Sequence, residues 1–142
     1  MTGIPPRFHL AIPVHDLGAA RAFYGDVLGC EEGRSADRWV DFNFGGHQLV
    51  CHLAAGSSRS VPRTNKVDGD AVPVPHFGLV LRLAEWKELA NRLEASGVGF
   101  AIPPRTRFAG TIGEQGTFFL CDPSGNTLEF KGFADLSRLF TR

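Results

Sequence analysis

The order of secondary-structure signals in the first half of the chain recurs in the second half. In each half, one strand pattern is followed by a helical period and then by three further strand patterns. His9 and His76 stand in the first strands of the two halves, 67 residues apart (76 − 9), and His52 and Glu129 stand in the last strands, 77 residues apart (129 − 52). A repeat of this kind indicates two copies of one βαβββ unit.

The first copy is predicted over residues 7–53. Its first strand is Phe8–Val14, and Asp16 is placed to cap a helix that ends near Gly29. The three further strands of this copy are expected at Cys30–Gly33, Arg38–Phe44 and His47–Leu53, with Gly45-Gly46 as the turn between the last two.

The second copy is predicted over residues 76–132. Its first strand is His76–Leu83, and its helix begins near Trp86 and stops at Gly97. The later strands are expected at Val98–Ile102, Thr117–Cys121 and Thr127–Lys131, with a loop at Pro103–Gly113. Two segments lie outside the copies: a polar linker at residues 54–75, and residues 133–142, where the amphipathic pattern of Phe133–Phe140 predicts a short helix.

These elements predict an α+β fold in which two βαβββ modules form a curved mixed sheet within a single domain of residues 1–142. In each module the helix is expected to cover the apolar face of the strands, which leaves the concave face free. We expect the two concave faces to meet and to form a metal-binding cleft. The linker is long enough for the modules to pair within one chain or by exchange between two chains, and we favour a homodimer.

The outer strands of the repeat carry metal-competent side chains opposite rows of apolar side chains. Because successive side chains of a strand alternate between its faces, the apolar residues of Phe8–Val14 lie on one face and His9 lies on the other. Imidazole and carboxylate groups are suitable ligands for Zn, Ni, Co, Mn or Fe. The sequence therefore predicts one divalent metal ion, bound by His9, His52, His76 and Glu129.

Several other side chains are expected to line the substrate site. By strand parity, Trp39, Asp41 and Asn43 face the pocket, where they offer stacking and hydrogen-bonding surface. The loop before the Thr117 strand adds Arg107 and Phe108, and Gln115 follows it. The two remaining histidines, His15 and His47, are interpreted as structural or surface residues.

Composition limits the partners of the chain. Lys plus Arg and Asp plus Glu both number 15, so no field of one sign is available to attract nucleic acid or an anionic membrane. The expected partners are a small-molecule substrate and another subunit. The N-terminus has no basic segment followed by an apolar run, which favours a cytoplasmic protein, and Cys30, Cys51 and Cys121 are interpreted as free thiols.

The motif Asp-Pro-x-Gly-x-x-Leu-Glu at residues 122–129, together with His9 and His76 in the first strands, resembles the vicinal-oxygen-chelate superfamily. This superfamily includes glyoxalase I, bleomycin-resistance proteins and extradiol dioxygenases. The resemblance implies metal ligands on the first and fourth strands of each module, which are His9, His52, His76 and Glu129 here. Members of the glyoxalase I type usually carry glutamate at the position of His52, whereas the extradiol enzymes and fosfomycin-modifying enzymes use a triad that corresponds to His9, His76 and Glu129.

The main functional hypothesis is a glyoxalase-like metalloenzyme, a lyase or isomerase whose small substrate is chelated through neighbouring oxygens. Glu129 or His52 would act as the general base next to a carbonyl that the metal polarises. One alternative is ring-cleaving oxygen chemistry of the extradiol type, with His52 as an acid-base group beside a three-residue ligand set. The other is a non-catalytic protein that sequesters a drug or metabolite.

Overall fold

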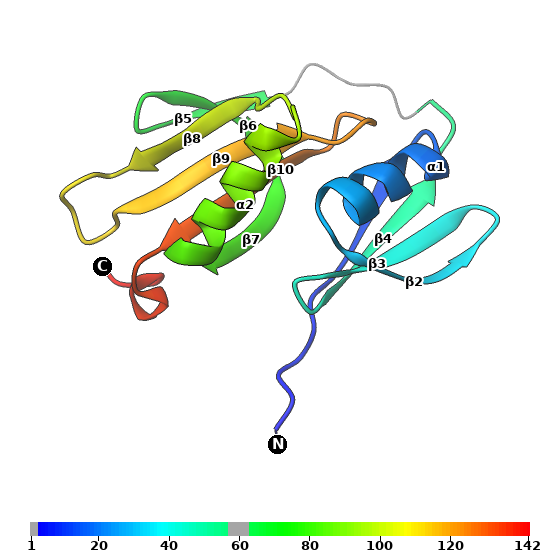
Figure 1. Cartoon of the computed structure of the whole chain (residues 1–142), viewed down its shortest axis with the longest axis horizontal. Coiled ribbons are helices and arrows are strands. Elements are labelled where there is room, and N and C mark those ends of the chain that lie inside the picture. Colours follow the sequence, from blue (N-terminus) through cyan, green and yellow to red (C-terminus); the bar gives the residue numbers. More distant parts are fainter. Residues whose placement is uncertain (1–2, 57–62) are drawn as a thin grey trace. The chain divides into compact units, whose positions relative to one another are not determined.

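The computed structural model describes residues 3–56 and 63–142 of the chain (Figure 1). These residues divide into two compact units, 3–56 with 123–125 and 63–122 with 126–142. Each unit contains one four-stranded mixed sheet and helical turns on one face of that sheet. The fold is therefore α+β, as the sequence pattern predicts.

The first unit has the predicted βαβββ order. Its elements are β1 (His9–Val14), α1 (Leu17–Ala20), the π-helical turn η1 (Arg21–Val27), β2 (Glu31–Ala36), β3 (Trp39–Phe44) and β4 (His47–Leu53). The strands lie in the order β1-β4-β3-β2, in which β1 and β4 are parallel and the other pairs are antiparallel. The first and last strands of the unit are thus neighbours.

Local sequence signals explain where the elements of the first unit begin and end. The Asp16 side chain accepts a hydrogen bond from Ala19 N at 2.8 Å, which caps α1 as predicted. Gly29 has a φ of 77°, and Gly45 and Gly46 have φ values of 61° and 90°. Residues without a Cβ adopt this left-handed conformation at little cost, so these glycines end the helical segment and form the β3–β4 turn.

Strand alternation divides the first sheet into an apolar face and a polar face. Val40, Phe42 and Phe44 are buried, and Tyr24 of η1 packs against Phe42 with ring centroids 5.7 Å apart. The opposite face carries His9 and the residues paired with it across β4 and β3. The division of β3 into a core face and a polar face, with Trp39, Asp41 and Asn43 on the polar face, is the predicted one.

The second unit repeats the first with one addition. Its elements are β5 (Arg63–Val67), β6 (Asp70–Val74), β7 (Phe77–Arg82), α2 (Leu83–Ala95), β8 (Ile102–Arg107), β9 (Gln115–Cys121), β10 (Thr127–Phe133) and the 3₁₀ turn η2 (Leu136–Arg138). The sheet order β7-β10-β9-β8, with β7 parallel to β10, matches the order in the first unit strand for strand. The predicted internal repeat is therefore confirmed.

Helix α2 packs on the apolar face of the second sheet through Trp86. The Trp86 indole lies over Gly116 of β9 and Gly132 of β10, and its Nε1 donates to Phe130 O at 2.9 Å. A Cβ atom at Gly132 would lie 2.6 Å from Trp86 Cβ, closer than van der Waals contact allows. These two glycines therefore create the groove that the indole fills.

The strand predicted at Cys30–Gly33 lies at Glu31–Ala36, and His76, predicted in the first strand of the second copy, lies just before β7. Three further segments differ more from the sequence prediction. Part of the expected linker forms the β5–β6 hairpin, in which Val72 is buried and Arg63–Val67 pairs antiparallel with Asp70–Val74. The strand expected at Val98–Ile102 lies later in the chain, as β8, and includes about half of the expected loop. The two prolines of β8 lie at a bulge on the edge of the sheet, where a missing N–H group removes no hydrogen bond between strands. The C-terminal helix is only the three-residue turn η2, because Phe133 continues β10 opposite Arg82.

Among residues 3–56 and 63–142, no helix combines the length and the apolar character that a membrane crossing requires.

The packing of Trp86 predicts that Gly132→Ala lowers the free energy of unfolding by about 1–3 kcal/mol, since a methyl group there forces the indole or β10 to move. Gly99→Ala is the control, because a Cβ at Gly99 meets nothing within 4 Å. Its effect is expected to stay within about 0.5 kcal/mol. Urea unfolding of both variants measures the difference, and equal stabilities would contradict the proposed packing.

Candidate metal centre

His9 is held in one orientation by a chain of hydrogen bonds on the polar face of the first sheet. Its Nδ1 lies 2.8 Å from Gln48 Oε1, and Gln48 Nε2 donates to Asp41 Oδ2 at 3.0 Å. Asp41 is buried and also accepts a hydrogen bond from Arg34 N. Because a carboxylate can only accept hydrogen bonds, the Gln48 amide turns its nitrogen toward Asp41 and its oxygen toward His9. His9 Nδ1 therefore carries the proton, and Nε2 is the nitrogen left for a ligand.

His52 lies on the same face as His9 but further along the strands. The parallel register places His9 opposite Gln48 and His52 opposite Pro13, and His52 also pairs with Trp39 of β3. Four residues at about 3.3 Å each put roughly 13 Å between the two positions along the strand direction. The first unit thus does not bring His9 and His52 together.

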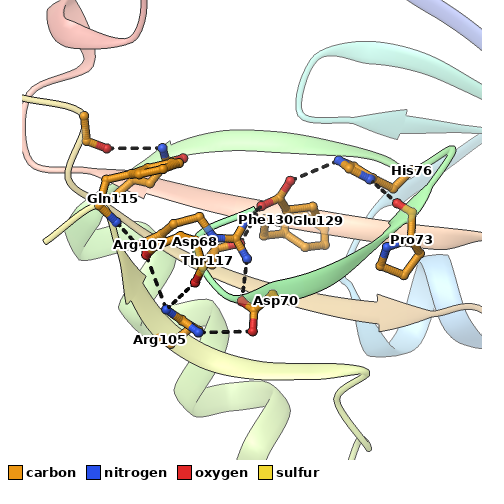
Figure 2. Close-up of polar contacts among 12 residues, drawn as sticks. Asp68, Asp70, Pro73, His76, Arg105, Arg107, Gln115, Thr117, Glu129 and Phe130 are labelled. Carbon is orange, nitrogen blue, oxygen red and sulfur yellow. Dashed lines mark hydrogen bonds and ion pairs between the residues drawn. The ribbon is translucent and has the colours of Figure 1, made fainter. Parts of the chain in front are cut away.

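The second unit brings His76 and Glu129 into contact. His76 Nε2 lies 3.1 Å from Glu129 Oε1, and His76 Nδ1 donates to the Pro73 carbonyl oxygen at 2.6 Å (Figure 2). The imidazole also rests edge-on against Phe119, with ring centroids 5.1 Å apart. The hydrogen bond at Nδ1 leaves Nε2 facing Glu129, and a hydrogen bond at the other ring nitrogen is the arrangement that metal-binding histidines usually have.

Glu129 is a buried carboxylate whose two oxygens have different partners. Oε1 faces His76, whereas Oε2 accepts a hydrogen bond from Thr117 Oγ1 at 2.6 Å and lies 3.5 Å from Arg107 Nη1. Burial by itself raises the pKa of Glu129, but the hydrogen bonds from His76 and Thr117 outweigh it and hold this pKa below its usual value. The contact with Glu129 in turn raises the pKa of His76, against the opposing effect of burial.

Arg107 lies on the side of Glu129 opposite His76, beside Oε2, and is 3% exposed. Its Nη2 pairs with Asp70 Oδ2 of the β5–β6 hairpin at 2.8 Å, and its guanidinium carbon lies 5.8 Å from the centre of the Phe119 ring. Arg105 joins the same hairpin through Asp70 at 3.1 Å and Asp68 at 3.4 Å. The buried charge of Arg107 is therefore compensated by carboxylates on two sides.

The remaining residues predicted to bind substrate have mixed placements. Asn43 accepts from Gly46 N at 2.7 Å, so its side chain supports the β3–β4 turn, and Trp39 is half-buried beside His52. Phe108 has a φ of 55° and donates its N–H to Asp68 Oδ2 at 3.0 Å, with its ring 38% exposed. Gln115 is half-buried opposite Arg107 in the β8–β9 pair.

The contact between His76 and Glu129 fits a metal ion. Two ligand atoms about 2.1 Å from one ion are separated by roughly 3.0–3.4 Å at octahedral or tetrahedral angles, and the observed separation of Nε2 and Oε1 is 3.1 Å. Within the described ranges, no group of three or more His, Cys, Asp and Glu side chains is arranged around a common point. His76 and Glu129 are thus the two predicted ligands that the structure brings together.

The two units differ at the position that Glu129 occupies. Glu129 pairs with Gly78, two residues after His76, and the residue paired with Ala11, two residues after His9, is Val50. The repeat therefore places an apolar side chain in the first unit where the second has a carboxylate. Comparison of equivalent strand positions in the two units shows this difference between Val50 and Glu129, whereas a search for metal-competent residue types does not.

Sequence reasoning missed the residues that hold the candidate ligands: Gln48, Asp70, Pro73 and Thr117. Strand parity gives a signal for two of them, because Gln48 shares a face with His52, and Thr117 shares a face with Phe119 and, across the ladder, with Glu129. Asp70 and Pro73 lie in the hairpin that the sequence pattern left as a linker, so no signal was available for them.

A family model described as Glyoxalase/Bleomycin resistance protein/Dioxygenase superfamily matches residues 8–130. A glyoxalase/bleomycin resistance protein/dioxygenase from Alicyclobacillus acidocaldarius is 37% identical over 99% of both chains, with a TM-score of 0.81. The chain belongs to this superfamily, which is the vicinal-oxygen-chelate group that its motifs resemble.

More distant solved structures share the fold. Lactoylglutathione lyase from Agrobacterium tumefaciens is 24% identical over 97% of this chain and 98% of its own, with a TM-score of 0.64. The fosfomycin resistance protein FosX from Listeria monocytogenes is 20% identical over 97% of this chain and 100% of its own, with a TM-score of 0.68. None of the curated proteins compared with the sequence matches it.

The hydrogen bond to Glu129 predicts that Thr117→Val lowers the free energy of unfolding by about 1.5–3 kcal/mol, because a buried carboxylate then loses its hydroxyl donor. Thr127→Val is the matched control on β10, since the one hydrogen-bond contact of the Thr127 hydroxyl among the described residues is with Cys121 Sγ at 4.0 Å. We expect it to cost less than about 1 kcal/mol. Urea unfolding distinguishes the two, and equal losses would contradict the assigned role of Thr117.

Proposed function

We propose that this chain is a metal-dependent enzyme in which His9, His76 and Glu129 bind one divalent ion, and that its substrate is a small molecule with two neighbouring oxygens. The observation that supports this most is the pairing of His76 with Glu129, in which the imidazole presents Nε2 and the carboxylate presents Oε1. His9 is prepared in the same way, since Gln48 fixes its Nδ1 proton. Two imidazole nitrogens and one carboxylate oxygen form a ligand set that Zn, Ni, Co, Mn and Fe accept.

The register of β1 and β4 supports a ligand set without His52. That residue stands four strand positions beyond the partner of His9, which puts roughly 13 Å between the two positions along the strands and favours a place for His52 beside the substrate over a place among the ligands. We therefore assign His52 the second role left open by the sequence, that of an acid-base group on the same face of the sheet. An imidazole titrates near neutral pH and can move a proton in either direction.

The proposed reaction is a lyase or isomerase reaction of the glyoxalase type. A bound divalent ion supplies Lewis acidity, which polarises a carbonyl oxygen and stabilises negative charge on it. We assign removal of the proton next to this carbonyl to His52, because Glu129 is engaged as a proposed ligand and because the hydrogen bonds from His76 and Thr117 lower its pKa. Glu129 remains a carboxylate throughout and neutralises positive charge at the site.

Polar atoms near Glu129 support a role in substrate binding for Arg107 and Gln115. Arg107 Nε and Gln115 Oε1 are buried and have no hydrogen-bond partner among the described residues. One is a donor and the other an acceptor, and their residues are cross-strand neighbours. We propose that a polar group of the substrate pairs with them, and that Trp39, Phe108 and Asp41 complete the substrate-binding set.

Oxygen-dependent ring cleavage of a catechol is the second candidate function. A ligand set without His52 also favours this function, because two histidines and one carboxylate with open coordination positions are the ligand set of non-haem iron oxygenases. We also propose a homodimer for either function, as the long connection between the modules suggests.

The ligand assignment predicts that the purified chain contains about one divalent ion. His76→Ala and Glu129→Ala are expected to weaken metal binding by more than the roughly 10–100-fold typical of losing a residue that only orients a metal ligand. His52→Gln is expected to retain the metal. His47→Gln serves as the control, because His47 Nδ1 accepts a hydrogen bond from Phe8 N and faces away from the site. Elemental analysis after dialysis measures all four, and unchanged metal content in the first two variants would refute the assignment.

The reaction class is tested by turnover with and without oxygen on a panel of 2-oxo thiol adducts, acyl thioesters and catechols. We expect oxygen-independent conversion of a 2-oxo substrate, reduced about 10²–10⁴-fold in His52→Gln because its general base is missing. Oxygen uptake coupled to catechol cleavage would replace this reaction with the second candidate. Tight binding of a panel member by metal-free protein, without turnover by either form, would indicate a sequestering protein.

A further inference from the structure

We propose that the β5–β6 hairpin is a positioning element of the candidate metal centre, and that Asp70 sets, through Arg107, the orientation in which Glu129 presents one oxygen to the metal. This inference rests on the proposed function. It assigns a role to a segment that is an addition to the βαβββ repeat, since the first unit has no equivalent of the hairpin among its described residues.

The hairpin contacts His76 directly and is linked to Glu129 through Arg107 (Figure 2). At its end nearest β7, the Pro73 carbonyl accepts the Nδ1 proton of His76 at 2.6 Å, which directs Nε2 toward Glu129. At its turn, Asp70 Oδ2 pairs with Arg107 Nη2 at 2.8 Å, while Asp70 Oδ1 pairs with Arg105 at 3.1 Å. One short segment therefore orients the imidazole directly and the carboxylate through an arginine.

Asp70 controls how strongly Arg107 acts on Glu129. The guanidinium is almost fully buried and lies between two carboxylates, 2.8 Å from Asp70 and 3.5 Å from Glu129. The shorter pair holds Arg107 toward the hairpin, so its contact with Glu129 Oε2 stays long and weak. Thr117 donates to the same Oε2 at 2.6 Å, which leaves Oε1 as the oxygen available to a metal.

Removal of the Asp70 charge changes this balance. Arg107 then has Glu129 as its remaining ion-pair partner among the described residues, and a buried guanidinium without full compensation moves toward the nearest carboxylate. A closer Arg107 neutralises Glu129 and pulls it toward β8, so the positive charge of arginine competes with the metal for this ligand. The affinity for a divalent ion falls, although none of the proposed ligands has been altered.

The test measures the Zn²⁺ dissociation constant of the full-length chain by competition with a chromophoric chelator. For Asp70→Asn we expect binding about tenfold to 100-fold weaker than wild type, the range typical of losing a residue that orients a ligand. Asp70→Ser is a second neutral variant with the same expectation, and Asp70→Glu, which restores the carboxylate, is expected to recover most of the affinity.

Asp68→Asn is the matched control in the same hairpin. Asp68 pairs with Arg105 at 3.4 Å and accepts from Phe108 N, and its removal leaves the Asp70–Arg107 pair in place. It is expected to bind Zn²⁺ as wild type does. A second readout is the visible absorption spectrum of the Co²⁺-loaded proteins, which reports the geometry of the ligands. It is expected to change in Asp70→Asn and Asp70→Ser but not in Asp68→Asn. Circular dichroism and thermal unfolding of the metal-free variants confirm that they are folded.

The outcomes separate this inference from the proposed function. Wild-type protein that binds no Zn²⁺ or Co²⁺ would overturn both. Tight binding by wild type with an unchanged dissociation constant and spectrum in folded Asp70→Asn would overturn the positioning role and leave the ligand set standing. Equal weakening in Asp68→Asn and Asp70→Asn would also overturn it, because the effect would then come from surface charge in general.

Discussion

Each unit of this protein depends on the parallel pairing of its first strand with its last. This pairing closes the order β1-β4-β3-β2 in one unit and β7-β10-β9-β8 in the other, and it brings the ends of a βαβββ segment side by side. It also fixes a register, which decides which residue of the last strand lies beside the histidine of the first. In the second unit this register places Glu129 opposite the residue two positions after His76. In the first unit Val50 holds that place, and His9 contacts the amide of Gln48 instead.

The difference between the copies has a chemical consequence. In the second unit, the buried Glu129 lies between the His76 imidazole and the positive guanidinium of Arg107. These contacts stabilise a charge that is unfavourable in an apolar interior. In the first unit, the buried carboxylate is Asp41, and it is one step removed from the histidine because Gln48 stands between them. One copy therefore offers an imidazole and a carboxylate, and the other offers an imidazole alone.

Hydrogen bonds fix the Nδ1 proton of both histidines, by different means. A backbone carbonyl fixes the Nδ1 proton of His76, and the amide of Gln48, held by Asp41, fixes that of His9. The Pro73 carbonyl that fixes His76 belongs to the β5–β6 hairpin, which has no counterpart in the described part of the first unit. The hairpin also carries the acidic residues that pair with Arg105 and Arg107. Duplication thus accounts for the sheets, and the inserted hairpin accounts for much of the polar network in the second unit.

The sequence by itself determined the repeat, the strand faces and the helix ends, because each of these follows from local alternation, from capping by Asp16 or from a glycine at positive φ. It also predicted that His76 and Glu129 share one site, and the structure places the two side chains in contact. Only the tertiary structure decided that His52 lies away from His9, and that Thr117, Arg107 and Asp70 surround Glu129. The physical reason is that register and hairpin docking are set by pairings between residues far apart in the chain, on which local residue patterns carry no information.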